Sequence, residues 1–352
     1  WQVAFSPDGK TIASASDDAT VKLWGIDGSL ITTLKGHDMA VYDIAFSPDG
    51  KTIASASNDK TVKLWRIDGS PITTLKGHND QVWQVAFSPD GKTIASASDD
   101  KTVKLWRIDG SLITTLKGHE AEVRQVAFSP DSKTIASASW DKTVKLWGID
   151  GSLITTLKGH EESVRHVAFS PDGKTIASAS DDATVKLWGI DGSLITTLKG
   201  HDLPVYDIAF SPDGKTIASA SVDKTLKLWE IDGREITTFN GHEDTVWQVA
   251  FSPDGKTIAS ASADKTVRLW RIDGSLITTL KGHEAEVNQV AFSPDGKTIA
   301  SASVDKTVKL WNLNLDNLLV QSCNWLHDYL KNSSNISEND KHLCDDVGGK
   351  LN

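Results

Sequence analysis

The chain has 352 residues, of which 39% are hydrophobic and 24% charged, a composition typical of folded globular domains. Its 37 Lys and Arg against 47 Asp and Glu give a formal net charge of −10. That balance argues against nucleic acid as a partner and favours neutral or basic partners. No apolar run approaches the length of a membrane helix, and no signal peptide or membrane partner is expected.

The number and position of the cysteines indicate the class of protein and its redox compartment. The only cysteines are Cys323 and Cys344, and none occurs in the first 313 residues. This distribution excludes a disulfide scaffold and favours a reducing, cytoplasmic setting.

From its first residue the chain repeats a 41-residue unit, and the ten residues WQVAFSPDGK at 1–10 return at 83–92 and 247–256. Each unit predicts four short strands rich in β-branched and aromatic residues. In one copy these are VWQVAFS (82–88), TIASAS (93–98), DKTVKLW (100–106) and LITTLKG (112–118). The Asp-Gly pairs of SPDGK and IDGS predict tight turns between strands.

Three landmarks recur with the same period. A Trp ends each third strand, at Trp24, Trp65, Trp106, Trp147, Trp188, Trp229, Trp270 and Trp311. An Asp stands six residues before each Trp, at Asp18, Asp59, Asp100, Asp141, Asp182, Asp223, Asp264 and Asp305. A Gly-His pair opens seven of the units, with His37, His78, His119, His160, His201, His242 and His283.

Four strands per unit, with Gly-His early and Trp late, resemble the WD-repeat β-propeller family. The resemblance covers residues 1–313 and implies an all-β propeller of four-stranded blades, with residues 314–352 as a C-terminal extension. One departure is that the residue after each Trp is Gly, Arg, Glu or Asn and never Asp. Eight units indicate eight blades, with seven as the alternative because that closure is commoner in the family.

The resemblance also implies a buried hydrogen-bond chain in each blade. In the second unit it would join His37, Asp59, Trp65 and Ser55, with Ser57 as the other candidate serine. Buried indole, imidazole and carboxylate groups each need a partner. The same chain is expected at the His, Asp and Trp of the later units named above.

The first unit begins at its first strand, so the fourth strand occurs only seven times. In the family a strand before the first Gly-His completes the last blade, and we expect an ITTLKGH-like segment to precede Trp1. Without it the last blade exposes an unpaired edge through which the chain could self-associate. Residues 317–321, NLLVQ, are an alternative source of that strand.

The copies differ mainly at one end of the expected propeller. The turns SPDGK and IDGS hardly change, whereas the residues after Gly-His, after the next Val and before the turn Asp vary. Aromatic and Arg side chains are typical of binding hot spots. The predicted contact residues are therefore Tyr42, Trp83, Arg124, Trp140, Arg165, Tyr206 and Trp247.

Acidic neighbours of these positions favour a protein partner with basic groups; they are Glu120, Glu122, Glu161, Glu162, Glu243 and Asp244. The competing interpretation is drift after duplication at solvated positions. The residue after each Trp also varies and does not follow this division between the two ends.

After Leu313 the pattern changes to helical spacing, with apolar residues from Leu315 to Leu330. This predicts a short helical tail that covers the propeller or docks another domain. Zinc binding by Cys323, His327, His342 and Cys344 is disfavoured because their spacing fits no familiar site. A Cys323–Cys344 disulfide is disfavoured in a cytoplasm.

The leading hypothesis for function is a non-catalytic protein-interaction platform. The alternative is a sensor or autoinhibitory module of a larger signalling ATPase. A propeller of near-identical repeats such as this one resembles the propellers of bacterial multidomain signalling ATPases. An enzyme is disfavoured, because the seven copies of His, Ser and Asp are better explained as structure than as a unique site. No P-loop or dinucleotide motif occurs, and neither cofactor nor metal is expected.

Overall fold

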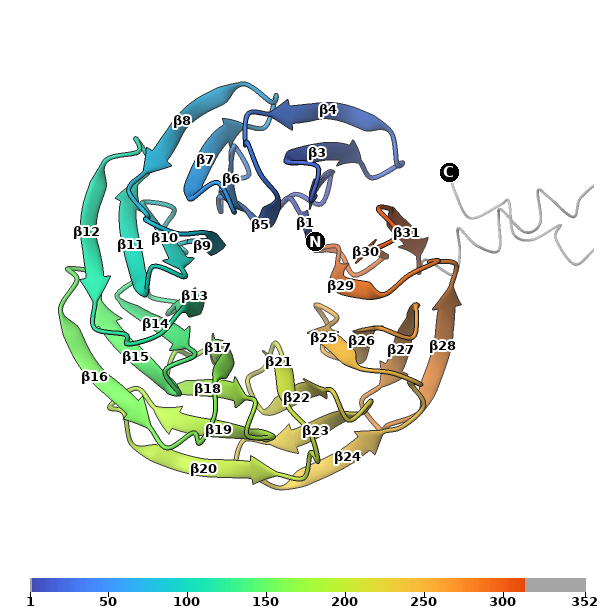
Figure 1. The fold of residues 1–352 in the computed structure, drawn as a ribbon. Coiled ribbons are helices and arrows are strands. Elements are labelled where there is room, and N and C mark those ends of the chain that lie inside the picture. Colours follow the sequence, from blue (N-terminus) through green and yellow to red (C-terminus); the bar gives the residue numbers. More distant parts are fainter. Residues whose placement is uncertain (1, 314–352) are drawn as a thin grey trace, which may run out of the picture.

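A computed structural model describes residues 2–313 and shows a ring of eight radial antiparallel sheets (Figure 1). The described residues form 31 strands and no helix. The predicted eight-bladed propeller is confirmed, and the seven-bladed alternative is wrong.

Each blade follows the strand order of its unit, from the axis outward. The first strands are β1 (Gln2–Phe5), β5 (Val41–Phe46), β9 (Val82–Phe87), β13 (Val123–Phe128), β17 (Val164–Phe169), β21 (Val205–Phe210), β25 (Val246–Phe251) and β29 (Val287–Phe292). The second strands are β2 (Thr11–Ala15), β6 (Thr52–Ser57), β10 (Thr93–Ser98), β14 (Thr134–Ser139), β18 (Thr175–Ser180), β22 (Thr216–Ser221), β26 (Thr257–Ser262) and β30 (Thr298–Ser303).

The outer half of each blade is built in the same way. The third strands are β3 (Thr20–Gly25), β7 (Thr61–Arg66), β11 (Thr102–Arg107), β15 (Thr143–Gly148), β19 (Thr184–Gly189), β23 (Leu226–Glu230), β27 (Thr266–Arg271) and β31 (Val308–Asn312). The fourth strands, on the rim, are β4 (Leu30–Lys35), β8 (Pro71–Lys76), β12 (Leu112–Lys117), β16 (Leu153–Lys158), β20 (Leu194–Lys199), β24 (Glu235–Phe239) and β28 (Leu276–Lys281).

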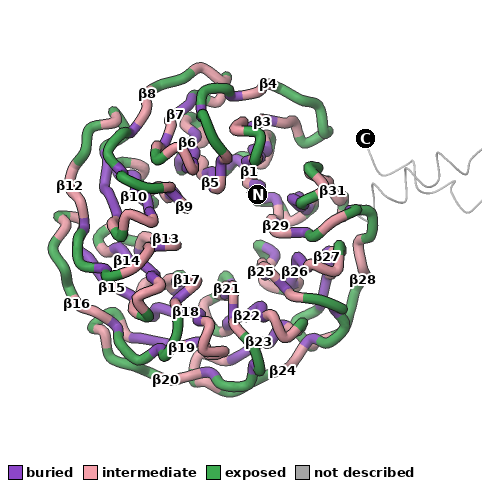
Figure 2. The backbone as a smooth tube through the Cα atoms, viewed as in Figure 1, coloured by how far each residue is buried: buried purple, intermediate pink, exposed green. Residues whose placement is uncertain are grey.

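The core lies between blades rather than within them. The second strands are buried except for a half-buried first Thr in most of them, and exposure grows from there toward the rim (Figure 2). Alternate Ala and Ser side chains in these strands are small enough for neighbouring sheets to pack closely. In one cluster Val21, Leu23 and Leu34 of one blade pack against Ile53 and Trp65 of the next. Each blade therefore depends on its neighbours for burial.

The repeated turns explain why the blades are so alike. In SPDGK, Asp49 accepts hydrogen bonds from the Ser47 hydroxyl at 2.6 Å and the Lys51 amide at 3.1 Å. Gly50 adopts φ +69°, a left-handed conformation that favours Gly. These turns and the IDGS turns lie at one end of the ring, because they connect the first strand to the second and the third to the fourth.

The last blade differs from the other seven. Among the described residues it has three strands, β29, β30 and β31, and no fourth strand pairs with β31. The ring still closes near the axis, where β1 contacts β29. The cluster at this seam has four buried residues, Val3, Ile12, Ala300 and Ala302, against nine in the first cluster.

Several sequence predictions lie outside the described residues. These are the helical tail, the strand predicted at 317–321, the disfavoured zinc site and the boundary at residue 314. Within residues 2–313 no helix could cross a membrane, and no group of three or more potential ligands is placed to hold a metal ion.

Candidate functional site

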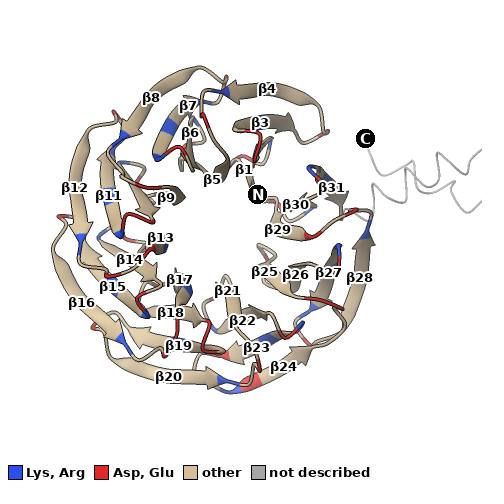
Figure 3. Ribbon diagram, viewed as in Figure 1, with Lys and Arg blue, Asp and Glu red and all other residues tan. Residues whose placement is uncertain are grey.

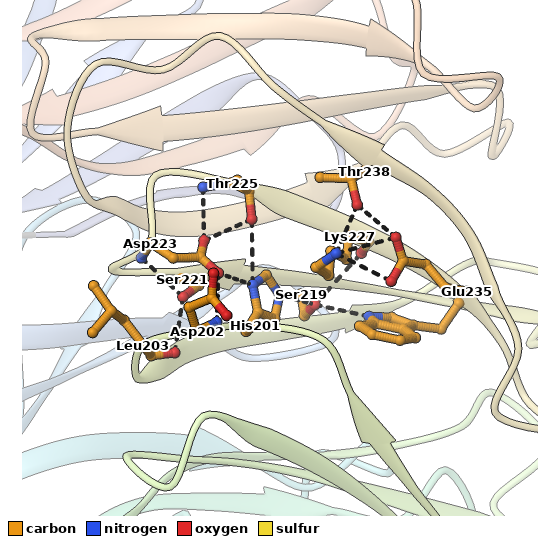
Figure 4. A network of polar contacts seen from close by, with 11 residues as sticks. His201, Asp202, Leu203, Ser219, Ser221, Asp223, Thr225, Lys227, Glu235 and Thr238 are labelled. Atoms are coloured by element: carbon orange, nitrogen blue, oxygen red, sulfur yellow. Dashed lines mark hydrogen bonds and ion pairs between the residues drawn. The ribbon is translucent and has the colours of Figure 1, made fainter.

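A buried hydrogen-bond chain occurs in each of the seven blades that begin with Gly-His. In the sixth blade, His201 contacts Asp223 through Nδ1 at 2.7 Å and Ser219 through Nε2 at 2.7 Å (Figure 4). The indole N–H of Trp229 donates to the same Ser219 hydroxyl at 2.9 Å. The hydrogen-bond chain thus links the loop before a blade to that blade's second and third strands.

The two candidate serines of the second blade take different roles. Ser55 contacts His37 at 2.8 Å and accepts the Trp65 N–H at 2.9 Å. Ser57 instead donates to the Ala40 carbonyl at 2.9 Å and accepts from the Asp59 amide. Ser55 is therefore the member of the chain, and Ser57 shapes the loop beside it.

These contacts follow the order Ser–His–Asp, but they do not make a hydrolytic site. A proton on His37 Nδ1 would be donated to Asp59, leaving Nε2 to accept from the Ser55 hydroxyl. The Ser55 oxygen already accepts the Trp65 N–H and is 0% exposed. A nucleophile must be reachable by its substrate, so the arrangement is structural.

The carboxylates of these chains are held ionised. Burial acts to raise the pKa of Asp59, but hydrogen bonds from His37 and Thr61 outweigh it and hold that pKa well below its ordinary value. At His242 burial dominates and lowers the imidazole pKa, against the opposing effect of Asp264. Both shifts favour a neutral His beside a charged Asp.

All seven predicted contact residues meet at the variable end of the ring. They form a continuous stacked series over six blades, called here the aromatic arc: Tyr42, Trp83, Arg124, Trp140, Arg165, Tyr206 and Trp247. Six stand at the starts of innermost strands, and Trp140 stands in the turn between β14 and β15.

Stacking holds the arc together. The rings of Tyr42 and Trp83 are 4.4 Å apart and nearly parallel, and the Arg124 guanidinium lies 3.4 Å above the Trp83 ring. The same guanidinium is 4.4 Å from the Trp140 ring, so it is held between two indoles. Such cation–π contacts are favourable when partly desolvated.

The series continues on the far side of Trp140. The Arg165 guanidinium lies 5.4 Å from the Trp140 ring and 5.1 Å from the Tyr206 ring. The Tyr206 and Trp247 rings then stack at 5.2 Å.

Two aspartates fix the cations of the arc. Asp181 accepts two hydrogen bonds from Arg165, both of 2.8 Å. Asp99 accepts from the Trp83 indole at 2.6 Å and lies 3.4 Å from Arg124. Burial lowers the pKa of Arg124, with Asp99 opposing the shift. These contacts hold the two Arg side chains of the arc in place.

A second ring of polar contacts, which sequence reasoning missed, lies one residue further along each innermost strand. At seven of the eight positions a side-chain oxygen accepts a backbone N–H of the next blade, as when the Val126 N–H donates to Gln84 at 2.7 Å and the Val290 N–H donates to Gln248 at 2.8 Å. Gln289 bonds Val3 in this way across the seam. The eighth position is His166, whose Nε2 instead contacts the Gln125 side-chain amide at 2.9 Å. The signal was a polar residue recurring at a fixed place: Gln2, Asp43, Gln84, Gln125, His166, Asp207, Gln248 and Gln289.

Three members of this second ring of polar contacts, called here the polar belt, are not Gln: Asp43, His166 and Asp207. Burial raises the pKa of Asp43 to about 7, although the amides of Val85 and Ile44 oppose the shift. Burial also raises the pKa of Asp207, opposed first by His166, whose Nε2 lies 3.2 Å from its carboxylate. The belt therefore contains carboxyl groups that resist ionisation.

Comparison with known families decides the affiliation of the chain. The model of the WD domain, G-beta repeat, matches residues 110–148, 151–189, 192–230, 233–271 and 274–312. The chain belongs to the WD-repeat family. Residues 1–107 of this WD-repeat chain also match the model of the IFT122 first beta-propeller.

Similar curated proteins share single repeats. A Notchless protein homolog of Arabidopsis thaliana is 61% identical over 36 residues, which is 10% of this chain and 8% of that protein. The nuclear distribution protein nudF of Aspergillus flavus is 54% identical over 43 residues, 12% of this chain and 10% of that protein. These matches span about a tenth of either protein. WD-repeat propellers are typically non-catalytic scaffolds, and such a role fits this chain.

Proposed function

We propose that this WD-repeat propeller binds protein partners on the end of the ring that carries the aromatic arc. The observation that carries the proposal is the convergence of seven variable residues, from six blades, into one stacked series. Repeats that are otherwise almost identical vary at the place where their side chains meet.

The arc is suited to binding because it is partly exposed and already ordered. The side chains of Arg124 and Arg165 are 19% and 32% exposed, and their ring neighbours are half-buried. Ordered aromatic and Arg side chains lose little conformational entropy when a partner covers them. They also supply the apolar area typical of hot spots.

Charge around the arc favours a partner with basic groups. Acidic residues recur in the loops that lead from the rim of one blade to the inner strand of the next (Figure 3). Nearby lysines already contact these loops, as when Lys142 donates to the Glu161 carbonyl at 2.7 Å and pairs with Glu162 at 3.3 Å. The remaining acidic groups would attract a basic partner.

A quantitative pull-down tests the proposal. The wild-type chain is compared with a variant that carries Trp83→Ala, Trp140→Ala and Trp247→Ala. The matched control carries Leu30→Ala, Leu153→Ala and Leu194→Ala, which alter exposed side chains on the rim. Circular dichroism establishes that each variant folds.

We expect the arc variant to lose partners that the wild type and the rim control both retain. Raising the salt concentration should weaken retention, because charge steers a basic partner. Equal partner sets for all three proteins would contradict the proposal.

A further inference from the structure

The differences between the units follow a second, longer period of four units. The sequence Val-Tyr-Asp-Ile occurs at 41–44 and again at 205–208, and in no other unit. In the unit that follows each of these, Val-Trp-Gln-Val occurs at 82–85 and 246–249. Because eight blades close the ring, four units correspond to half a turn about its axis. The variable end of the ring therefore has approximate twofold symmetry.

Each half of the variable end carries the same stacked aromatic pair. The rings of Tyr42 and Trp83 are 4.4 Å apart with 10° between their planes, and those of Tyr206 and Trp247 are 5.2 Å apart with 3°. All four side chains are half-buried. One pair joins the starts of β5 and β9 and the other joins the starts of β21 and β25, on the opposite side of the axis (Figure 1).

The loop before each pair presents an exposed apolar side chain. Met39 is 52% exposed and Leu203 is 46% exposed. The two loops are held in the same way, since the Met39 carbonyl accepts from the Ser57 hydroxyl at 3.1 Å and the Leu203 carbonyl from the Ser221 hydroxyl at 3.0 Å (Figure 4). Each aromatic pair is thus accompanied by an apolar side chain that a partner can cover.

Exposed carboxylates accompany both apolar positions. Asp38 and Asp202 directly precede them, and Asp80 and Asp244 stand in the loop of the following unit. Carboxylates around an apolar contact are complementary to a segment in which basic residues adjoin an apolar one.

These side chains form two groups of the same composition, called here the half-sites. The first half-site consists of Asp38, Met39, Tyr42, Asp80 and Trp83, and the second of Asp202, Leu203, Tyr206, Asp244 and Trp247.

The half-sites differ on the far side of the Trp. Asp99, which accepts the Trp83 N–H at 2.6 Å, corresponds to Ala263 beside Trp247. The stacked rings, the exposed apolar side chain and the carboxylates are common to both. The shared chemistry is therefore that of one kind of segment bound twice.

We propose that the arc end of the ring binds a twofold-symmetric homodimer, whose subunits place the same segment in the two half-sites. The inference rests on the proposed function, which puts the partner at this end. In each segment an apolar side chain packs on Met39 or Leu203, and adjoining Arg or Lys side chains face the carboxylates. Equal contacts at two sites half a turn apart require a partner with the same symmetry.

The rest of the arc favours one partner that reaches both half-sites. Arg124, Trp140 and Arg165 connect Trp83 to Tyr206 through successive stacking contacts, so the surface between the half-sites is continuous. A second copy of this chain is a poor occupant, because it has a formal charge of −10 and would present the same acidic loops to this end.

Probes with one and with two segments test the inference on the full chain. The single probe is a labelled peptide, Gly-Arg-Leu-Arg-Gly. The double probes carry two copies of it on Gly-Ser linkers of about 10, 20 or 40 residues, whose root-mean-square spans are roughly 17, 25 and 35 Å. Calorimetry measures the stoichiometry, and fluorescence anisotropy measures the affinity.

We expect two single peptides to bind each chain but only one double probe. With the linker that best matches the span, the double probe should bind at least about tenfold more tightly than the single peptide, because its second contact is intramolecular. A single peptide with Ser in place of its Leu keeps the same charge and should bind about tenfold more weakly, since it cannot make the apolar contact.

Variants of the protein separate the half-sites. Met39→Lys or Leu203→Lys places a cation at one half-site, so either change should reduce the bound single peptides from two to one and remove the gain from the linker. Both changes together should abolish binding. The matched control carries Leu30→Lys and Leu194→Lys, which alter two exposed rim residues that also lie half a turn apart. The control should still bind two peptides.

Three results would overturn the inference. They are one peptide per chain, unequal effects of Met39→Lys and Leu203→Lys, and a double probe that binds no more tightly than the single one with any linker. The last result would mean that the half-sites bind two independent monomers. The proposed function fails separately, when the triple arc variant retains every partner of the wild type.

Discussion

At the scale of single residues, stability depends on buried polar groups that satisfy one another. Each Trp–Ser–His–Asp chain joins a loop and two strands, and each of its members would be costly to bury alone. The eight units provide internal comparisons, because the first blade has the Ser, Asp and Trp but no His contact among the described residues.

Removing one member of a complete chain should therefore destabilise more than removing its counterpart in the first blade. Asp141→Ala leaves the buried His119 without its 2.7 Å partner and should lower the free energy of unfolding by about 1–3 kcal/mol. Asp18→Ala loses only local turn contacts and should have the smaller effect. Urea denaturation followed by circular dichroism measures both, and equal losses would contradict the structural role of the chain.

In the polar belt we predict a substitution that raises the free energy of unfolding instead of lowering it. Asp43 has a pKa of about 7 in the folded protein against an ordinary value of 3.8. The folded state thus binds more protons than the unfolded state between these values, and stability falls as pH rises across that window. Asp43→Asn should remove this dependence, giving no gain below pH 3.8 and a gain of at most ~4 kcal/mol above pH 7.

Asp207→Asn is the matched control, because Asp207 is equally enclosed but lies 3.2 Å from His166. Its gain should be smaller, since His166 opposes the rise in the Asp207 pKa. Urea denaturation at a series of pH values compares the variants. A gain for Asp43→Asn that does not change with pH would show that the carboxyl group is not protonated on folding.

At the scale of elements, the fourth strand contributes mainly through its contacts with the next blade. The strand itself lies on the exposed rim, but Leu34 and Thr32 reach the turn glycine of the following blade. The same strand that completes one sheet therefore fixes the position of the next.

A comparison of Ala substitutions at two turn glycines distinguishes the cost of backbone strain from the cost of a steric clash. Gly28 and Gly69 have φ of +83° and +91°, so an Ala at either site pays a similar conformational penalty. Among the residues that the structure describes, only Gly69→Ala also places a Cβ close to a neighbour, 2.8 Å from Thr32. We expect Gly69→Ala to destabilise by about 1–3 kcal/mol more than Gly28→Ala in thermal or urea unfolding. Equal losses would mean that the turn adjusts without resistance.

At the scale of the whole molecule, the eight similar units do not all make the same contacts with their neighbours. Seven junctions contain a fourth strand, and the seam does not among the described residues. Closure there rests on the innermost strands, the Gln289–Val3 contact and four buried apolar residues. From these described contacts we expect the ring to open more easily at the seam than at the other junctions.

Hydrogen exchange of the free protein tests this view. Amides of Val308–Leu310 in β31 should exchange at least tenfold faster than those of Val144–Leu146 in β15, which has strand partners on both sides. The sequences of the two strands are nearly the same, so a difference would report position in the ring. Equal protection would indicate that the seam is as stable as the other junctions.

The family resemblance implied the hydrogen-bond chain and left seven blades as an alternative to eight. The sequence by itself determined the period of the repeat, the strands and turns of each unit and the positions at which the copies vary. It could do so because period, turn chemistry and internal variation are properties of local sequence, repeated often enough to read. It named Ser55 as the serine of the chain but kept Ser57 as the other candidate, since both are small and lie in the same strand close to the turn.

Only the tertiary structure decided how units contact one another. The stacking of Arg124 on Trp83, the contact of Asp43 with the Val85 amide and the small cavity lined by Trp24 and Val308 all arise between different blades. Such contacts depend on the spacing and rotation of whole sheets about the axis, which no single repeat encodes.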